Sequence, residues 1–291
     1  MCKYLHIVSG TGDVANGMVV AARLLSKEQG DAEVIDLGQG MHRIHEGEVE
    51  EVWVHGMWLP GMWVICWMAL RAGKRLVRMT HGSLSPVYLT QQSPLRKKLV
   101  SPIERYFLRC ADKVVATCEM EAEWIRTYLN RRCPPVEVTD LKRFFTLESQ
   151  NTRNAWNVDE PLHLLYLGRR HPLKGVEYLE AAVNELSNSA THKLAISPRL
   201  KIVSTAFGDE KESVLSWCDI LILPTLSDNF GLVVAEALEH GKVVITTDGA
   251  PAWGDGNDYG GRLVYLRGYR DGTDAVRVRL LTEALSVCAN H

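Results

Sequence analysis

The sequence predicts an α/β protein made of two doubly wound domains, each a parallel sheet with helices on both faces. Three observations predict this fold class. Short apolar, β-branched runs alternate with segments of helical periodicity. The alternation stops at a polar stretch and then restarts. A length of 291 residues also suits two domains of roughly 130 to 160 residues each. Strand–helix alternation of this kind favours parallel sheets covered on both faces.

The first half of the chain contains six expected strands and four expected helices. The strands are expected at residues 5–8, 33–37, 52–55, 75–79, 113–116 and 136–139, and the helices at 16–27, 59–72, 94–109 and 119–130. Residues 142–159 are polar and lack periodicity, so we interpret them as the interdomain linker. The predicted domains are therefore residues 1–150 and 151–291.

In the second half the alternation restarts. Strands are expected at residues 162–167, 220–223 and 243–246, and helices at 176–186, 232–240 and 273–289. An alternative left open for the last helix is that it packs back on the first domain. Ligands of doubly wound domains bind at the carboxyl ends of the strands, so the loops after the strands are where functional residues are expected.

Composition excludes several classes of protein. The chain is 46% hydrophobic and 23% charged, with 33 basic against 35 acidic side chains and a net charge of −2. It is therefore not a disordered chain, and no nucleic acid partner is expected. Seven scattered cysteines without a C-x-x-C pair indicate reduced thiols rather than zinc or disulfides. No secretory signal is recognisable, and the longest apolar stretch, residues 57–70, is too short to span a bilayer. A cytoplasmic location is expected.

A glycine-rich loop follows the first expected strand. Gly10, Gly12 and Gly17 give the spacing G-x-G-x4-G, which differs from the dinucleotide-binding fingerprint. Its amides could approach a phosphate or a sugar closely, so Gly12 and Gly17 are candidate donor-binding residues. A glycine turn at this place is also common in α/β domains of any function.

A basic turn follows the expected strand at residues 162–167. It reads Gly-Arg-Arg-His-Pro-Leu-Lys-Gly over residues 168–175, with Arg169 and Lys174 as candidate ligands. Cations at the carboxyl edge of a parallel sheet suit a diphosphate, because arginine forks onto phosphate oxygens and lysine offers a point charge. The alternative reading is a solvated basic turn.

Two carboxylates follow the strand at residues 220–223. Asp228 precedes an expected helix whose first turn offers free amides, and Glu236 lies two turns further along. Such a site suits an anionic group at the helix start and hydroxyls on the carboxylates, which a nucleotide-sugar provides. The alternative is an aspartate N-cap and a surface glutamate.

These two segments together resemble the GT-B glycosyltransferases of family 4, retaining enzymes that use nucleotide-sugar donors. Their GR-x4-KG signature is matched at residues 168–175, and their S-E-N-F-G-x4-E-A-L signature at residues 227–238, with Asp228 in place of the first glutamate. The resemblance implies that Arg169 and Lys174 contact the donor diphosphate, Glu236 the ribose and Asp228 the transferred sugar. It further implies donor contacts from a short backbone segment comprising Asn229, Phe230, Gly231 and Leu232.

The first half shows a second resemblance. Residues 53–58 and 80–86 are similar to acceptor-domain patterns of bacterial polysaccharide and lipopolysaccharide enzymes of this family, and residues 111–119 are similar to the strand that follows them. By this resemblance His81 faces the reaction centre, which makes it a candidate catalytic residue with Asp228, Arg169 and Lys174. His55 is the weaker candidate, since a histidine at a strand end is more often structural.

Basic residues dominate between Arg71 and Lys113. Ten basic side chains stand against two acidic ones, and the expected helix at residues 94–109 carries Arg96, Lys97 and Lys98. The cluster suits a phosphorylated glycolipid acceptor or an anionic membrane surface, which leaves the inner face of the cytoplasmic membrane open as a location. A solvated helix face is the alternative.

The resemblance implies transfer of a sugar from a UDP-, GDP- or ADP-sugar to a saccharide or glycolipid acceptor, such as lipopolysaccharide core or a polysaccharide. It also implies retention at the anomeric carbon and no metal or other cofactor. The segment that usually contacts the base is compressed between residues 186 and 219, so the base is not predicted. Two alternatives stay open. One is a GT-B epimerase or hydrolase of nucleotide-sugars, and the other is a non-catalytic carbohydrate or nucleotide-sugar binding protein.

Overall fold

The computed structural model describes residues 2–10, 17–91, 93–147, 160–188 and 197–289. The chain divides into two compact units, Met1–Leu141 and Lys142–His291. The division thus falls after residue 141, whereas the sequence placed it after residue 150. Residues 142–147 belong to the second unit because Lys142 Nζ donates to the Ala252 carbonyl at 3.0 Å and Arg262 Nη2 donates to the Leu147 carbonyl. Most of the expected linker, residues 148–159, lies outside the described residues.

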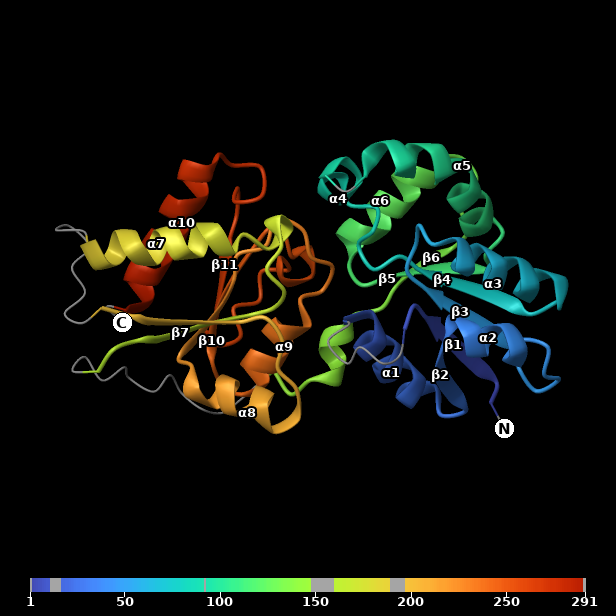
Figure 1. Cartoon of the computed structure of the whole chain (residues 1–291), viewed down its shortest axis with the longest axis horizontal. Helices are drawn as coiled ribbons and strands as arrows, with labels where there is room; N and C mark the ends of the chain where they lie inside the picture. Colours follow the sequence, from blue (N-terminus) through green and yellow to red (C-terminus); the bar gives the residue numbers. More distant parts are fainter. Residues whose placement is uncertain (1, 11–16, 92, 148–159, 189–196, 290–291) are drawn as a thin grey trace. The chain divides into compact units, whose positions relative to one another are not determined.

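The first unit is a six-stranded parallel sheet of order β2-β1-β3-β4-β5-β6 (Figure 1). Its strands are β1 (Tyr4–Val8), β2 (Ala32–Asp36), β3 (Glu51–His55), β4 (Arg75–Met79), β5 (Lys113–Ala116) and β6 (Val136–Val138). Its helices are α1 (Gly17–Gln29), α2 (Leu37–Arg43), α3 (Pro60–Arg71), α4 (Pro86–Gln91), α5 (Pro94–Arg109) and α6 (Glu119–Leu129).

The two faces of this sheet are covered differently. A large apolar core joins alternate residues of the strands to α2, α3, α5 and α6 and includes Leu5, Val54 and Ile65. On the opposite face, α1 packs on β1 and β2 through a smaller cluster that contains Val8 and Val19. Successive strand residues point to opposite faces, so the residues between the core positions of β1 and β3 lie on the α1 side.

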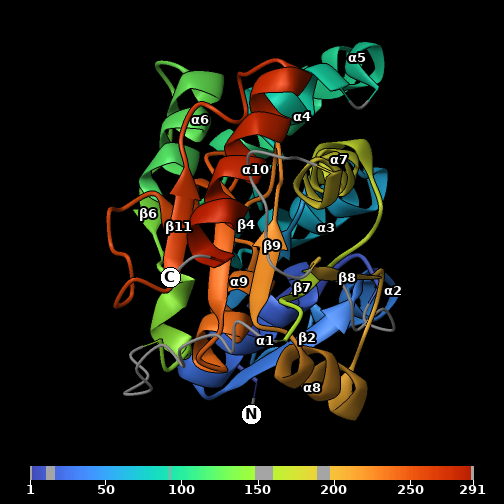
Figure 2. The ribbon, with the colours of Figure 1, turned by 90° about the vertical axis from the view of Figure 1, so that its left-hand side faces the viewer.

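The second unit is a five-stranded parallel sheet of order β11-β10-β9-β7-β8. Its strands are β7 (His163–Leu167), β8 (Arg199–Val203), β9 (Ile220–Leu223), β10 (Val243–Thr247) and β11 (Leu263–Leu266). Its α-helices are α7 (Val176–Asn188), α8 (Gly208–Trp217), α9 (Leu232–Glu239) and α10 (Asp274–Ala289). Helix α10 lies alongside α7 (Figure 2) and also packs on β11, so its main partners are within its own unit.

The two doubly wound sheets confirm the predicted fold class. Several short elements were missed, namely α2, α4, α8, β8 and β11. Helix α2 has only seven residues and contains Gly38 and Gly40, so its sequence carries little periodicity. It begins at a capping box in which the Asp36 carboxylate accepts from the Gln39 amide at 2.9 Å.

Candidate functional site

Three loops lie side by side at one edge of the second sheet. Strands β9, β7 and β8 are neighbours and parallel, so the loops at residues 224–231, 168–175 and 204–207 leave the sheet at the same edge. The carboxyl edge of a doubly wound sheet is its usual ligand site. Arg169 and Lys174 lie on one of these loops, and Asp228, 54 residues after Lys174, lies on another.

The backbone ties two of these loops together. The Leu173 carbonyl accepts hydrogen bonds from the Leu226 amide at 2.8 Å and from Thr225 Oγ1 at 3.0 Å. Gly175 lies against the second loop, where a Cβ atom would stand 2.2 Å from the Pro224 carbonyl oxygen, and its φ of +62° also favours glycine. Only glycine fits this crossing, and the crossing fixes the position of Lys174 beside residues 226–228.

Lys174 and Asp228 form an ion pair across the two loops. Each side chain is 22% exposed, so both ends of the pair are accessible to a ligand. The second Asp228 oxygen accepts from the Asn229 amide at 2.8 Å. Asp228 is not the N-cap of α9, because that position is Gly231. The reading of Asp228 as a simple helix cap is therefore excluded.

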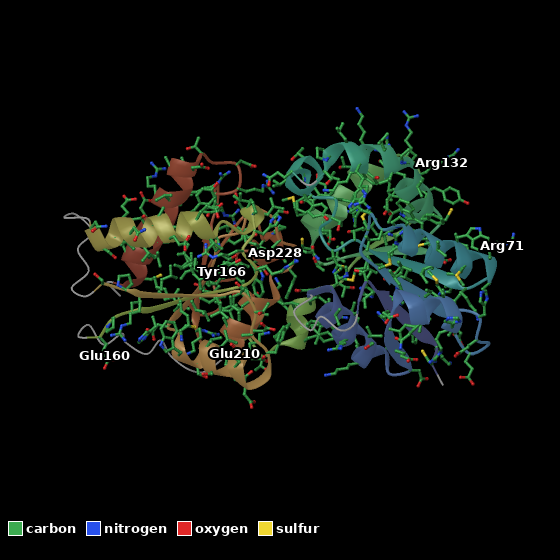
Figure 3. All side chains as sticks on the ribbon, viewed as in Figure 1. Arg71, Arg132, Glu160, Tyr166, Glu210 and Asp228 are labelled. Carbon is green, nitrogen blue, oxygen red and sulfur yellow. The ribbon has the colours of Figure 1, made fainter. Side chains whose placement is uncertain are left out.

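The turn that carries Arg169 is shaped by a buried tyrosine. Tyr166 OH donates to the Arg169 carbonyl at 2.9 Å. Burial, and secondly the Asp228 carboxylate, raise the pKa of Tyr166, so this donor keeps its proton. Figure 3 labels Tyr166 and Asp228, which both belong to the second unit.

The two neighbouring arginines differ in their contacts. Arg170 reaches α7, where its guanidinium bonds Glu180 at 2.5 and 3.3 Å. Arg169 is exposed, and among the described residues no partner of its guanidinium is found. Of these two arginines, Arg169 is thus the one available to a diphosphate.

The start of α9 presents backbone amides to the same edge. Gly231 adopts a left-handed conformation with φ of 67° and is followed by Leu232, the first helical residue. The Phe230 side chain is buried, and its carbonyl accepts from Trp253 Nε1 at 2.5 Å. Only the backbone of Phe230 can therefore face a ligand. The first amides of a helix have no partner within it and carry its positive dipole end, which favours an anion.

Glu236 has a partner that the sequence did not reveal. Its Oε1 accepts from Lys211 Nζ of α8 at 2.5 Å, and its side chain is 17% exposed. Lys211 follows the loop after β8, so the pair belongs to the same edge of the sheet. The polar segment around Lys211 gave no sequence signal, because the pairing depends on the neighbourhood of β8 and β7.

In the first unit, His81 lies just after β4 in a strained backbone. Its φ is +49°, which a non-glycine residue rarely adopts. The fully buried carboxylate of Glu121 holds the turn around it. One Glu121 oxygen accepts from Thr80 Oγ1 and from the Gly82 amide, both at 2.6 Å, and the other accepts from the Thr117 amide at 2.8 Å. Strain held in this way is typical of functional sites.

The remaining candidates are placed as follows. Gly12 lies outside the described residues, and Gly17 is the exposed first residue of α1. Asn229 is partly exposed beside Asp228. Among the described side chains, no three His, Cys, Asp or Glu residues are grouped to hold a metal ion.

The basic cluster of residues 71–113 is less exposed than expected. Arg78 is fully buried and paired with Glu104 at 3.4 Å. Lys97 is buried against Tyr88, with Nζ 3.7 Å from the ring centre, and burial lowers its pKa to about 8. Treating Lys97 as part of a solvated or membrane-facing patch with Arg96 and Lys98 was therefore wrong. Within the described part of the chain, no helix is long and apolar enough to cross a membrane.

Comparison with known proteins supports the reading of both units. Residues 14–140 match the glycosyl transferase 4-like domain, and residues 161–275 match the glycosyl transferases group 1 domain. A search of curated proteins by sequence finds no significant match.

Solved structures share the fold over nearly the whole chain. Sucrose-phosphate synthase from Thermosynechococcus elongatus is 15% identical with a TM-score of 0.67, over 98% of this chain and 90% of that one. Anabaena HepE in complex with UDP-glucose is 14% identical with a TM-score of 0.61, over 99% and 94%. The UDP-forming α,α-trehalose-phosphate synthase from Burkholderia xenovorans, in complex with glucose-6-phosphate, is 10% identical with a TM-score of 0.64, over 97% and 91%. With matches in both units and this architecture, the chain belongs to the group 1 glycosyltransferases and has the GT-B fold.

Proposed function

We propose that this protein transfers a sugar from a nucleotide-sugar to a saccharide or glycolipid acceptor, with retention at the anomeric carbon. The observation that carries the proposal is the grouping of Arg169, Lys174 and Asp228 on two loops joined by the Leu173 carbonyl. Their edge of the sheet also holds the start of α9. Two cations, helix amides and a carboxylate suit a diphosphate bonded to a sugar.

In this mechanism the leaving diphosphate is stabilised by the chain itself. Donor binding exchanges the Lys174–Asp228 ion pair for a contact between Lys174 and the diphosphate, which frees Asp228 for the sugar hydroxyls. Arg169 and the first amides of α9 complete the set of donors around the developing charge. Attack from the face of the leaving group then gives retention, and we propose that no metal ion is needed.

Glu236 is proposed to bind the donor ribose. Its partner Lys211 holds the carboxylate at the sheet edge before the nucleotide binds. We propose UDP-sugars as the first donors to test, with GDP- and ADP-sugars next. The support for this order is that the fold relative HepE binds UDP and UDP-glucose.

We propose that the acceptor is a glycolipid, such as lipopolysaccharide core or a polysaccharide precursor, met at the inner face of the cytoplasmic membrane. Helix α5 supports this, because one of its faces is apolar and exposed. Leu95 and Leu99 are 78% and 80% exposed, and Ile103 and Tyr106 continue the stripe at helical spacing. Exposed Lys98, Arg105 and Arg109 lie along one edge of it. An apolar stripe edged by cations suits an anionic bilayer surface.

Turnover of a nucleotide-sugar panel, with and without a mixed glycolipid and saccharide acceptor fraction, tests the function. A transferase forms a glycosylated product only with acceptor. Free sugar or an isomerised donor formed without acceptor would identify a hydrolase or an epimerase, and binding without any turnover would identify a binding protein. Proton NMR of the new anomeric centre tests retention, and unchanged rates in EDTA test metal independence.

Vesicle sedimentation tests the membrane contact. Leu95→Gln combined with Leu99→Gln should reduce binding to anionic vesicles, and Lys98→Gln should weaken it further at low salt only, since exposed charges are screened beyond about 10 Å at 0.1 M salt. Val287→Gln, an exposed apolar residue of α10, is the control. Equal binding of all variants would contradict the contact.

A further inference from the structure

Three histidines form one hydrogen-bonded chain across the first sheet. His6 of β1 and His55 of β3 are joined between Nδ1 and Nε2 at 2.9 Å. His55 Nδ1 is joined to His81 Nε2, also at 2.9 Å. At the inner end, His6 Nε2 lies 2.6 Å from Gln29 Oε1 of α1. The chain thus runs from the end of α1 to the strained residue after β4.

The inner part of this chain is dry and tightly packed. His6 and His55 are fully buried, and the Trp53 ring stacks on His6 with 4.9 Å between centres. Burial lowers the pKa of His6 to about 4 and that of His81 to about 3, and it also lowers the pKa of His55. All three rings are therefore neutral near pH 7, and each has one N–H and one lone pair.

Neutral rings in a chain have linked tautomers. Gln29 Oε1 is an acceptor, so His6 Nε2 carries the proton and His6 Nδ1 accepts. His55 must then donate from Nε2 and accept at Nδ1. His81 must in turn donate from Nε2, which leaves the lone pair on its Nδ1. In the described part of the structure no group donates to that lone pair.

The position of this lone pair is fixed as well as its polarity. Glu121 binds the Thr80 hydroxyl and the Gly82 amide on either side of His81, and His55 holds its ring. Three apolar side chains at positions 6, 55 and 81 could be buried without removing polar groups from water. Stability alone therefore does not explain three buried imidazoles.

We propose that Gln29, His6 and His55 are positioning residues that fix the tautomer of His81, so that its Nδ1 accepts a hydrogen bond from a hydroxyl of the substrate sugar. This inference rests on the proposed function. By this inference Gln29, on helix α1 of the same unit, determines whether His81 Nδ1 is a hydrogen-bond acceptor or a donor.

The tautomer itself can be read without substrate. Two-bond ¹H–¹⁵N spectra of the histidine-labelled full chain at pH 7.5 should show Nδ1 of His81 as the unprotonated nitrogen. Gln29→Glu keeps the acceptor and should keep this pattern. Gln29→Lys replaces it by a donor and should move the proton of His81 to Nδ1. Glu28→Lys, an exposed neighbour in the same helix, is the matched control and should change nothing.

Kinetics then test the role of the lone pair. Gln29→Lys should lower kcat/KM about tenfold, the cost of an unmade hydrogen bond to a buried partner, whereas Gln29→Glu and Glu28→Lys should stay within about twofold. If Gln29→Lys fails to fold, His55→Phe takes its place in the test. It fills the same volume without ring nitrogens and should also lower kcat/KM about tenfold.

Two results would overturn the proposal. One is a protonated Nδ1 at His81 in the wild type, and the other is a reversed tautomer in Gln29→Lys with unchanged kcat/KM. If no nucleotide-sugar is turned over by the wild type, the proposed function fails, and the role of the lone pair toward a sugar fails with it. The spectra would still decide whether Gln29 sets the tautomer.

Discussion

Replacing Arg169 and Arg170 separately gives a sharp test of the donor site. The two residues are adjacent, exposed and of the same type, yet only Arg170 has a partner for its guanidinium, Glu180, within the described residues. Arg169→Ala removes no described side-chain contact, so the free energy of unfolding should change by no more than about 0.5 kcal/mol. A charge-assisted contact to the donor diphosphate is worth roughly 1.5 to 3 kcal/mol, so donor turnover should fall roughly 10- to 150-fold.

Arg170→Ala is the matched control. It removes an ion pair on the surface of α7, and such pairs contribute little to stability, so both stability and turnover should stay near the wild type. Initial rates over a range of donor concentrations, with thermal unfolding of each variant, measure both effects. Equal rates for Arg169→Ala and wild type, or an equal loss in both variants, would refute the assignment of Arg169 to the diphosphate.

Three further predictions follow from the ion pairs and the buried histidines. Glu236→Gln should mainly raise the donor KM, because an amide still makes one ribose hydrogen bond, and Lys211→Met should raise it less; an unchanged KM in Glu236→Gln would exclude the ribose role. Asp228→Asn should lower kcat while free nucleotide still binds, and Asp228→Glu should keep partial activity; loss of nucleotide binding in Asp228→Asn, measured by calorimetry, would move this residue to the nucleotide. Folded His6 has a pKa of about 4 against an unfolded value of about 6.5, so stability is full above about pH 6.5 and falls by roughly 3 kcal/mol as pH drops to about 4. Urea unfolding should show this slope in the wild type and a smaller slope in His6→Asn, and equal slopes would contradict the buried neutral ring.

The sequence predicted elements well where local pattern decides them. The strands Arg75–Met79 and Ile220–Leu223 appear at the predicted bounds, because segments of four or five residues rich in aliphatic side chains, lying between helical patterns, are too short for helices and favour strands. Helix α8 was missed because its sequence is mostly polar and its burial comes from β7 rather than from an apolar stripe.

Sequence motifs indicated the candidate residues, but they did not indicate which side chains those residues contact. The meeting of Lys174 with Asp228 depends on the Leu173 carbonyl and on the close approach at Gly175, which no spacing reveals. His55 was the weaker candidate in the sequence, and the structure places it in the middle of a hydrogen-bonded chain that ends at His81. Lys97 was read as a surface charge, although the Tyr88 ring and carbonyl cover it.

The proposed donor site can be tested by a crystal structure of the protein with the nucleoside diphosphate that raises its melting temperature most. We expect the diphosphate at the carboxyl ends of β7 and β9, with its oxygens within hydrogen-bond distance of the Arg169 guanidinium and Lys174 Nζ and with the Lys174–Asp228 ion pair broken. A nucleotide bound elsewhere, or bound with that ion pair intact, would contradict the proposed site.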